Sequence, residues 1–193
     1  MSDDEAPVKR GATYADLMDL PEHVVGELIN GNLYATPRPR WRHALLAGAV
    51  AEQVRGAVGH RARGADGWWI VAEPELHLGA QVVVPDLAGW RRDRTPSIPP
   101  DATRIEIAPD WVCEILSPST ARRDRGEKLP IYAGAGVGHA WIVDPVACTL
   151  EVLRRVDDAW LVVATHGGAG CVSPEPFAAS AFDLAEWWSP DRP

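Results

Sequence analysis

Two apolar runs in the middle of the chain each carry an acid. Residues 82–86 read VVVPD and end on Asp86, and residues 111–116 read WVCEIL and contain Glu114. Short apolar runs bounded by turn residues indicate strands that are buried on both faces of a sheet. Both acids must therefore be paired, protonated or bound to a metal ion, because an isolated buried charge has a high free-energy cost.

The remaining pattern predicts a mixed α/β fold. Helices are predicted at residues 14–20, 41–63, 121–133 and 183–188, and strands at residues 24–29, 32–36, 68–72, 75–78, 82–84, 111–116, 140–143, 150–155 and 160–164. Asn30 and Gly31 are typical of a two-residue hairpin turn. Residues 111–143 read as strand, helix and strand, which is a parallel crossover unit. We expect a mixed sheet flanked by helices, preceded by an N-terminal helix and hairpin.

The length of 193 residues favours one domain, which we place at residues 13–193 after a polar lead at residues 1–12 that we expect to be disordered. The lead has no apolar stretch, and no apolar run approaches the roughly 20 residues that span a bilayer. These features favour a soluble, cytoplasmic protein with no membrane contact. Three widely spaced cysteines are typical of reduced thiols and not of a disulfide framework or a zinc site.

The basic residues are unevenly distributed. The net charge of −8 argues against a protein that coats nucleic acid by bulk electrostatics. Nine of the 17 arginines nevertheless lie in three clusters, at residues 38–42, 91–94 and 122–125. Each cluster either contacts a phosphate-bearing ligand or is a solvated loop or helix face. In the third cluster we expect Arg122 and Arg123 to bind substrate.

Lys128 is the only lysine beyond Lys9. A lysine is a compact point charge that suits a scissile phosphate, but Asp124 and Lys128 are also spaced as an ordinary surface ion pair on a helix. Glu27, inside an apolar strand, is either a further carboxylate of a site or an exposed edge position. His43 either contacts substrate or is a partly exposed helix residue.

If the strands that carry Asp86 and Glu114 are neighbours, the two carboxylates can face one point at the end of the sheet. Two carboxylates, phosphate oxygens and water suit Mg²⁺ or Mn²⁺, and such an ion polarises a phosphate and activates a water. Alternatively, Asp86 caps a turn and Glu114 pairs with an arginine. The sequence contains no P-loop, no G-x-S-x-G and no zinc pattern.

Several motifs occur together over roughly residues 14–188. They are ELINGNL at residues 27–33, His43, VPDL at residues 84–87, DWVCEILSPST at residues 110–120, Asp124 with Lys128 and Tyr132, and GVGHAWIVDP at residues 136–145. This combination resembles the Uma-type family of restriction endonucleases, which is similar to the PD-(D/E)XK nuclease superfamily.

The resemblance implies a restriction-endonuclease-like core and a divalent ion held by Asp86, Glu114 and the main-chain carbonyl of Ile115. It places Glu27 as the N-terminal acid of the same site. The superfamily lysine position is Leu116 here, so Lys128 on the next helix is the candidate replacement. The resemblance also implies a homodimer.

Three functions remain open from the sequence. The first is a Mg²⁺-dependent endonuclease that hydrolyses phosphodiester bonds of DNA, with Glu27, Asp86, Glu114 and Lys128 as catalytic residues. The second is a catalytically inactive nuclease-fold module that binds nucleic acid or protein, which the net charge and Leu116 favour. The third is a phosphoesterase that acts on small molecules.

Overall fold

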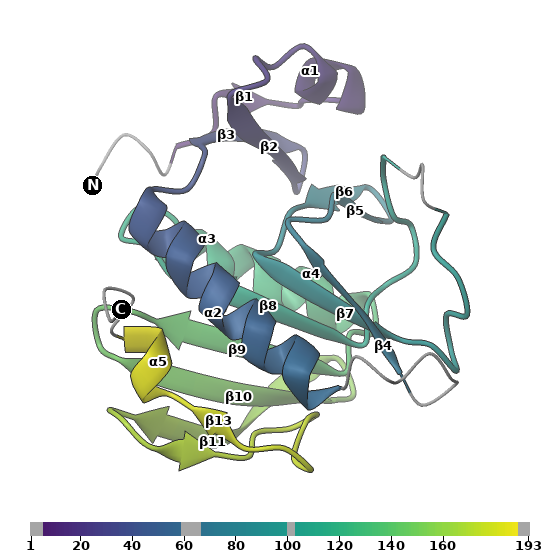
Figure 1. The fold of residues 1–193 in the computed structure, drawn as a ribbon. Coiled ribbons are helices and arrows are strands. Elements are labelled where there is room, and N and C mark those ends of the chain that lie inside the picture. The colour runs from purple at the N-terminus through teal and green to yellow at the C-terminus, as the bar shows by residue number, and fades with distance from the viewer. Residues whose placement is uncertain (1–5, 59–66, 100–102, 189–193) are drawn as a thin grey trace.

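The computed structural model describes residues 6–58, 67–99 and 103–188 of the chain (Figure 1). The strands are β1 (Lys9–Arg10), β2 (Val24–Ile29), β3 (Asn32–Pro37), β4 (Trp68–Ala72), β5 (Leu76–Leu78), β6 (Gln81–Val83), β7 (Leu87–Arg91), β8 (Trp111–Ile115), β9 (His139–Asp144), β10 (Thr149–Val156), β11 (Ala159–Gly167), β12 (Cys171–Val172) and β13 (Phe182–Asp183). The helices are α1 (Tyr14–Met18), α2 (Trp41–Ala57), α3 (Ala121–Arg123), the π-helix η2 (Asp124–Lys128), α4 (Leu129–Gly134) and α5 (Ala185–Trp188).

The larger of the two main sheets has the strand order β11-β10-β9-β8-β7-β4. Its neighbours are antiparallel except β8 and β9, which pair in parallel. The continuous helical segment α3–η2–α4 connects these two strands, as the crossover pattern predicted. The expectation of a mixed sheet flanked by helices is thereby confirmed.

Helices cover both faces of this sheet (Figure 1). On one face, Leu46, Val50 and Val54 of α2 belong to an apolar core with alternate residues of β8 and β9 and with Trp187 of α5. On the other face, Leu129 and Tyr132 of α4 pack with the intervening residues of the same strands. The strands are therefore buried on both sides, which explains their nearly continuous apolar sequences.

The smaller sheet has the order β1-β3-β2-β6-β5 and lies at the N-terminal side of the molecule, together with α1 (Figure 1). Asn30 and Gly31 both have positive φ, 51° and 73°, as the predicted hairpin turn between β2 and β3 requires. The chain passes from the smaller sheet to the larger one between β6 and β7. Asp86 lies in this connection, just before β7.

The structure differs from the sequence-based prediction at several elements. Lys9 and Arg10, expected to be disordered, pair with β3 as β1, because the edge of β3 offers unpaired backbone groups. β7 was not predicted. Helix α2 ends at Ala57, and the predicted helical residues 59–63 lie outside the described residues, as do residues 1–5 of the lead. The predicted C-terminal helix is split into β13 and α5.

No helix in the described ranges has the length and apolar character needed to cross a bilayer. Cys113, Cys148 and Cys171 are free thiols, in agreement with the odd count and the wide spacing.

Candidate active site

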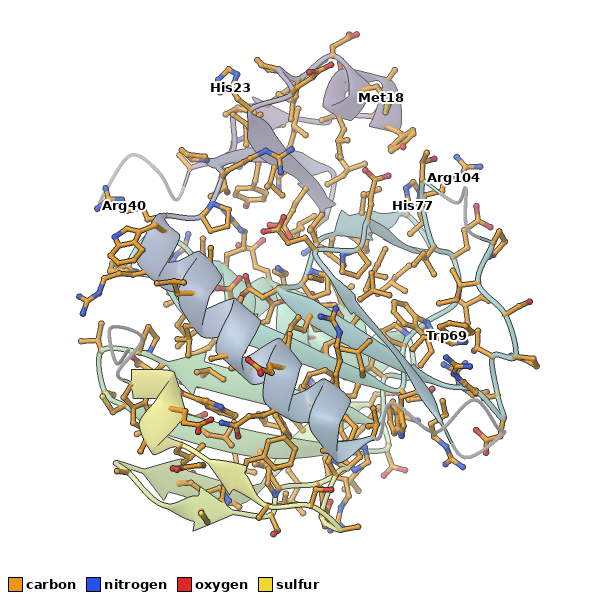
Figure 2. All side chains as sticks on the ribbon, in the orientation of Figure 1. Met18, His23, Arg40, Trp69, His77 and Arg104 are labelled. Atoms are coloured by element: carbon orange, nitrogen blue, oxygen red, sulfur yellow. The ribbon has the colours of Figure 1, made fainter. Side chains whose placement is uncertain are left out.

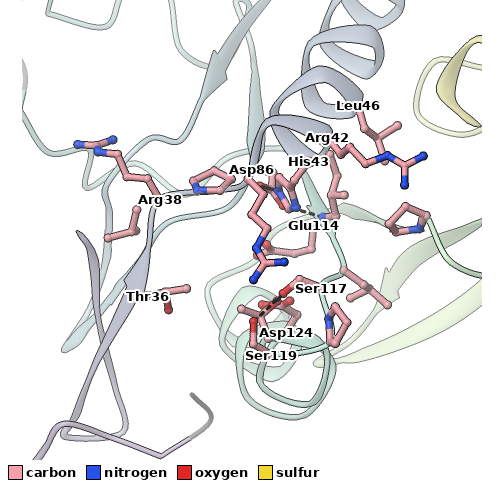
Figure 3. Close-up of a pocket in the computed structure, with 18 of the residues that line it drawn as sticks. Thr36, Arg38, Arg42, His43, Leu46, Asp86, Glu114, Ser117, Ser119 and Asp124 are labelled. Carbon is pink, nitrogen blue, oxygen red and sulfur yellow. Dashed lines mark hydrogen bonds and ion pairs between the residues drawn. The ribbon is translucent and has the colours of Figure 1, made fainter. Parts of the chain in front are cut away.

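A pocket of about 720 Å³ lies where the two main sheets meet the start of α2 and the start of the crossover helices. Glu27 of β2, Asp86, Glu114 of β8 and Lys128 of η2 all line it. Figure 3 shows His43 and Asp86 on one side of this pocket, with Glu114 between them and Asp124. The residues that the sequence singled out as catalytic are thus brought to one place by four different elements.

Lys128 is the centre of the arrangement. Its ammonium nitrogen lies 2.9 Å from Glu27 Oε1, 2.9 Å from Glu114 Oε1 and 3.0 Å from the carbonyl oxygen of Val84. Asp124 is 3.7 Å away, and both side chains are buried. The interpretation of Lys128 and Asp124 as a solvated surface pair is therefore wrong. Burial alone lowers the pKa of Lys128, but Glu114, Glu27 and Asp124 outweigh it and raise the pKa.

Glu114 is held by two donors, Lys128 and the hydroxyl of Tyr132, which donates to Oε1 at 2.5 Å. Its side chain is almost fully buried. Burial raises the pKa of Glu114 well above its ordinary value; Lys128 opposes this shift, and the charges of Asp124, Asp86 and Glu27 add to it. The ionised carboxylate is thus disfavoured mainly by burial, which Lys128 does not offset.

Asp86 is fixed at both carboxylate oxygens. Oδ1 lies 2.6 Å from Nε2 of His43, and Oδ2 accepts a hydrogen bond from the backbone N–H of Ile115 at 2.7 Å. This second bond places Asp86 directly beside the strand position that follows Glu114. Burial works to lower the pKa of His43, but the hydrogen bond and charge of Asp86 prevail and raise it. His43 is a partly exposed residue of α2, as one of its two interpretations expected, and it also contacts Asp86; contact with substrate stays a prediction.

Glu27 is not an exposed edge residue, because it is buried at 4% exposure and accepts the backbone N–H of Val84 at 2.9 Å. Arg123 is buried beside it, with Nε 3.5 Å from Glu27 Oε2 and with a hydrogen bond from Nη2 to Thr36. The guanidinium also lies over the ring of Tyr34. Arg123 lines the pocket, whereas Arg122 is exposed outside its wall, and substrate binding by Arg122 stays a prediction.

The donor atoms suit a hard divalent cation. Within the described residues, no group of three or more His, Cys, Asp or Glu side chains has the arrangement of a metal site. The set implied by the resemblance is two carboxylates and one main-chain carbonyl, all of them oxygen donors, which is the chemistry that Mg²⁺ and Mn²⁺ prefer.

The charges of the cluster point the same way. Four carboxylates (Glu27, Asp86, Glu114 and Asp124) line the pocket together with only two permanently charged cations of this cluster, Arg123 and Lys128. A further divalent ion would compensate the excess negative charge and favour the ionised form of Glu114. The residues present therefore fit such an ion.

The sequence did not predict the contacts that Arg123 and Tyr132 make within this cluster. The buried pairing of Arg123 with Glu27 and Thr36 joins residues 87 or more positions apart, which no local pattern reveals. Tyr132 appeared only as part of the family motif. Its position four residues after Lys128 on the same helical segment was a usable signal, because such residues share one helix face.

Comparison of the chain with known proteins identifies one family by sequence and one similar fold by structure. The chain matches the family model described as "Uma2: Putative restriction endonuclease" over residues 13–185. A crystal structure of "a putative nuclease belonging to DUF820" from Anabaena variabilis ATCC 29413 is 22% identical in sequence. The two structures superpose with a TM-score of 0.73 over 93% of this chain and 98% of that chain, which shows a shared fold. No curated protein matches the chain.

Proposed function

Since this chain belongs to the Uma2 family of restriction-endonuclease-like proteins, we propose that it is a metal-dependent endonuclease that hydrolyses phosphodiester bonds of DNA. The observation that carries the proposal is the convergence of carboxylates from both main sheets on one buried lysine, Lys128, inside a pocket. A structural ion pair alone needs one acid for one lysine. A site for a phosphate and a cation needs the surplus of acids that is found here.

Asp86, Glu114 and the carbonyl of Ile115 would hold Mg²⁺ or Mn²⁺, which would polarise the scissile phosphate and lower the pKa of the attacking water. His43 orients Asp86 through the 2.6 Å contact, and Tyr132 orients Glu114 through the 2.5 Å hydrogen bond. Groups that hold the ligands of a site in this way keep its geometry fixed.

Lys128 is the positive group that stabilises the charge of the phosphate in the transition state. Its position on η2 compensates for Leu116, because its ammonium reaches Glu114 although its backbone lies on another element. An ammonium has three donor hydrogens, and Glu27, Glu114 and Val84 accept all three. Contact with a phosphate therefore requires Lys128 to release one of these partners.

A plasmid-nicking assay tests the proposal, because a closed circle has no ends and reports internal cleavage only. We expect nicking with Mg²⁺, none with EDTA, and a loss of at least about 100-fold in Glu114→Gln and Asp86→Asn, as is typical when an electrostatic contact in the transition state is removed. Glu106→Gln, a change of an exposed acid, is the matched control and should nick as the wild type does. Wild-type rates in both site variants would refute the assignment.

The inactive-module alternative has one observation in its favour, which is that the donors of Lys128 are already satisfied within the protein. It predicts DNA or protein binding that is unaffected by EDTA, no nicking by the wild type, and no heat of Mn²⁺ binding in calorimetry. A Mn²⁺ isotherm that disappears in Glu114→Gln would count against it.

We also propose the homodimer and the cytoplasmic location that the family resemblance and the composition imply. Light scattering on the purified chain tests the dimer. A measured mass close to that of the monomer would contradict it.

A further inference from the structure

The segment that joins β3 to α2 carries three arginines and a tryptophan, Arg38, Arg40, Trp41 and Arg42, which we call the arginine rim. All three arginines line the pocket. Arg40 lies at the start of α2, at the outer edge of the molecule (Figure 2). The proposed chemistry uses none of these residues.

The rim has few partners within the protein. Arg38 contacts the carbonyl of Glu22 and lies 4.0 Å from Glu73. Arg40 and Arg42 are exposed, and neither side chain forms a hydrogen bond or ion pair with any described residue. Trp41 lies between them and is 64% exposed, so its aromatic ring is open to solvent beside the pocket.

The backbone adds positive character at the same place. Helix α2 starts with Arg40 as its N-cap, without a side-chain cap and without an acid in the first turn. The first N–H to find an acceptor within the helix is that of Ala44, which donates to Arg40. No acid of the helix's own first turn compensates the positive end of this 17-residue helix, which lies next to two arginines.

Arg123 supplies independent support for an anion at this pocket. It is 3% exposed and lines the pocket, and its Nη1 has no hydrogen-bond acceptor among the described residues, whereas Nε lies 3.5 Å from Glu27 Oε2. Buried donors are normally satisfied, so unsatisfied guanidinium hydrogens in a pocket wall indicate a missing acceptor. A phosphate oxygen is the acceptor that a guanidinium binds best.

We propose that the arginine rim binds an unpaired segment of nucleic acid strand and leads it into the pocket. Arg40, Arg42 and the start of α2 contact phosphates, and Trp41 stacks on a base. The face of a base is open to a tryptophan only where the strand is unpaired, since in a duplex the bases cover one another. This inference rests on the proposed function and names its substrate more closely as single-stranded or locally opened DNA.

Fluorescence anisotropy in EDTA tests the inference without cleavage, with a labelled strand of about 16 nucleotides, long enough for one binding site, and with the same strand annealed to its complement. We expect the wild type to bind the single strand more tightly than the duplex. Trp41→Ala should weaken single-strand binding roughly 5- to 100-fold, and Trp41→Phe should restore most of it. Arg40→Ala and Arg42→Ala should each lower the salt dependence of the logarithm of affinity by about 0.7.

Arg104→Ala and Met18→Ala are the matched controls, because both residues are exposed at positions distant from Arg40 (Figure 2). They should bind as the wild type does. Unchanged binding by Trp41→Ala, equal losses in the controls, tighter binding of the duplex, or no binding by the wild type would overturn the inference.

Loss of nicking in Glu114→Gln, together with unchanged strand binding in the rim variants, would refute the role of the arginine rim and leave the endonuclease assignment intact. Unchanged nicking in Glu114→Gln, together with weakened strand binding in the rim variants, would refute the endonuclease assignment alone.

Discussion

At the scale of single residues, Lys128 is the residue on which the site depends. It is 3% exposed, yet each hydrogen of its ammonium has an acceptor, and three carboxylates lie within 4.0 Å. The charged form is therefore retained despite burial, as the direction of its pKa shift indicates. Removal of one partner from a buried ion pair is expensive because it leaves the other charge uncompensated.

Lys128→Met should lower the free energy of unfolding at neutral pH by about 3–5 kcal/mol, because Glu27 and Glu114 are left without their common cation. The chain offers a matched control in its only other lysine, Lys9, whose ion pair with Asp16 is at the surface. Lys9→Met should have little measurable effect. Urea denaturation followed by tryptophan fluorescence measures both variants, and similar small losses in the two would contradict a central role for Lys128.

The sequence was sufficient to find the charged members of the site but not their partners. Asp86, Glu114 and Glu27 could be identified because each interrupts or ends an apolar run, where a charge requires an explanation. Lys128 could be identified because lysine is so rare in this chain. The contacts of Arg123 with Thr36 and Glu27 depend on how the two sheets meet, and sequence spacing carries no information about that.

At the scale of elements, the local signals were the reliable ones. The hairpin turn and the crossover were both predicted, because positive φ at Asn30-Gly31 and alternation of strand and helix leave clear marks in the sequence. β7 was missed because its sequence, LAGWR, has no β-branched residue and contains a glycine, so it lacks the apolar run that marked the strands at residues 82–84 and 111–116. Gly89 in its middle marks the packing, since an added Cβ would lie 3.0–3.2 Å from Ile70, Trp111 and Trp68.

The two kinds of glycine position in these elements should respond oppositely to alanine. Gly48 lies within α2, and an added Cβ would meet no atom within 4 Å. Gly48→Ala should therefore raise the free energy of unfolding by about 0.5–1 kcal/mol, because alanine is the better helix former. Gly31→Ala should lower it, because the turn holds φ at 73°. Chemical denaturation measures both, and a loss of stability in Gly48→Ala would contradict the helix geometry described.

At the scale of the whole molecule, the site lies at the junction of the two main sheets. Glu27 belongs to the smaller sheet, Glu114 to the larger one, and Val84 to the connection between them, and Lys128 contacts all three. The same contacts therefore join the N-terminal hairpin to the body of the protein and hold the carboxylates together. Stability and the geometry of the site are consequently coupled, and the pH dependence of unfolding should reveal this coupling.

The pKa of Glu114 is raised in the folded protein, mainly by burial, above its ordinary value near 4.5. Between these two pKa values the folded state binds more protons than the unfolded state, so linkage requires the free energy of unfolding to fall as pH rises through that window. The Glu114→Gln variant has no titratable carboxyl group at this position. The stability of the wild type should therefore decline relative to that of Glu114→Gln in EDTA as the pH rises above 4.5, the ordinary pKa of the group.

Mg²⁺ should reduce this relative decline, because a cation bound at Glu114 favours the ionised carboxylate in the folded state. Urea denaturation of both proteins across this range, in EDTA and in Mg²⁺, measures the effect. Parallel curves in EDTA would show that Glu114 titrates normally and is not buried among like charges. A decline that Mg²⁺ leaves unchanged would instead remove Glu114 from the proposed set of metal ligands, even if the buried cluster itself is as described.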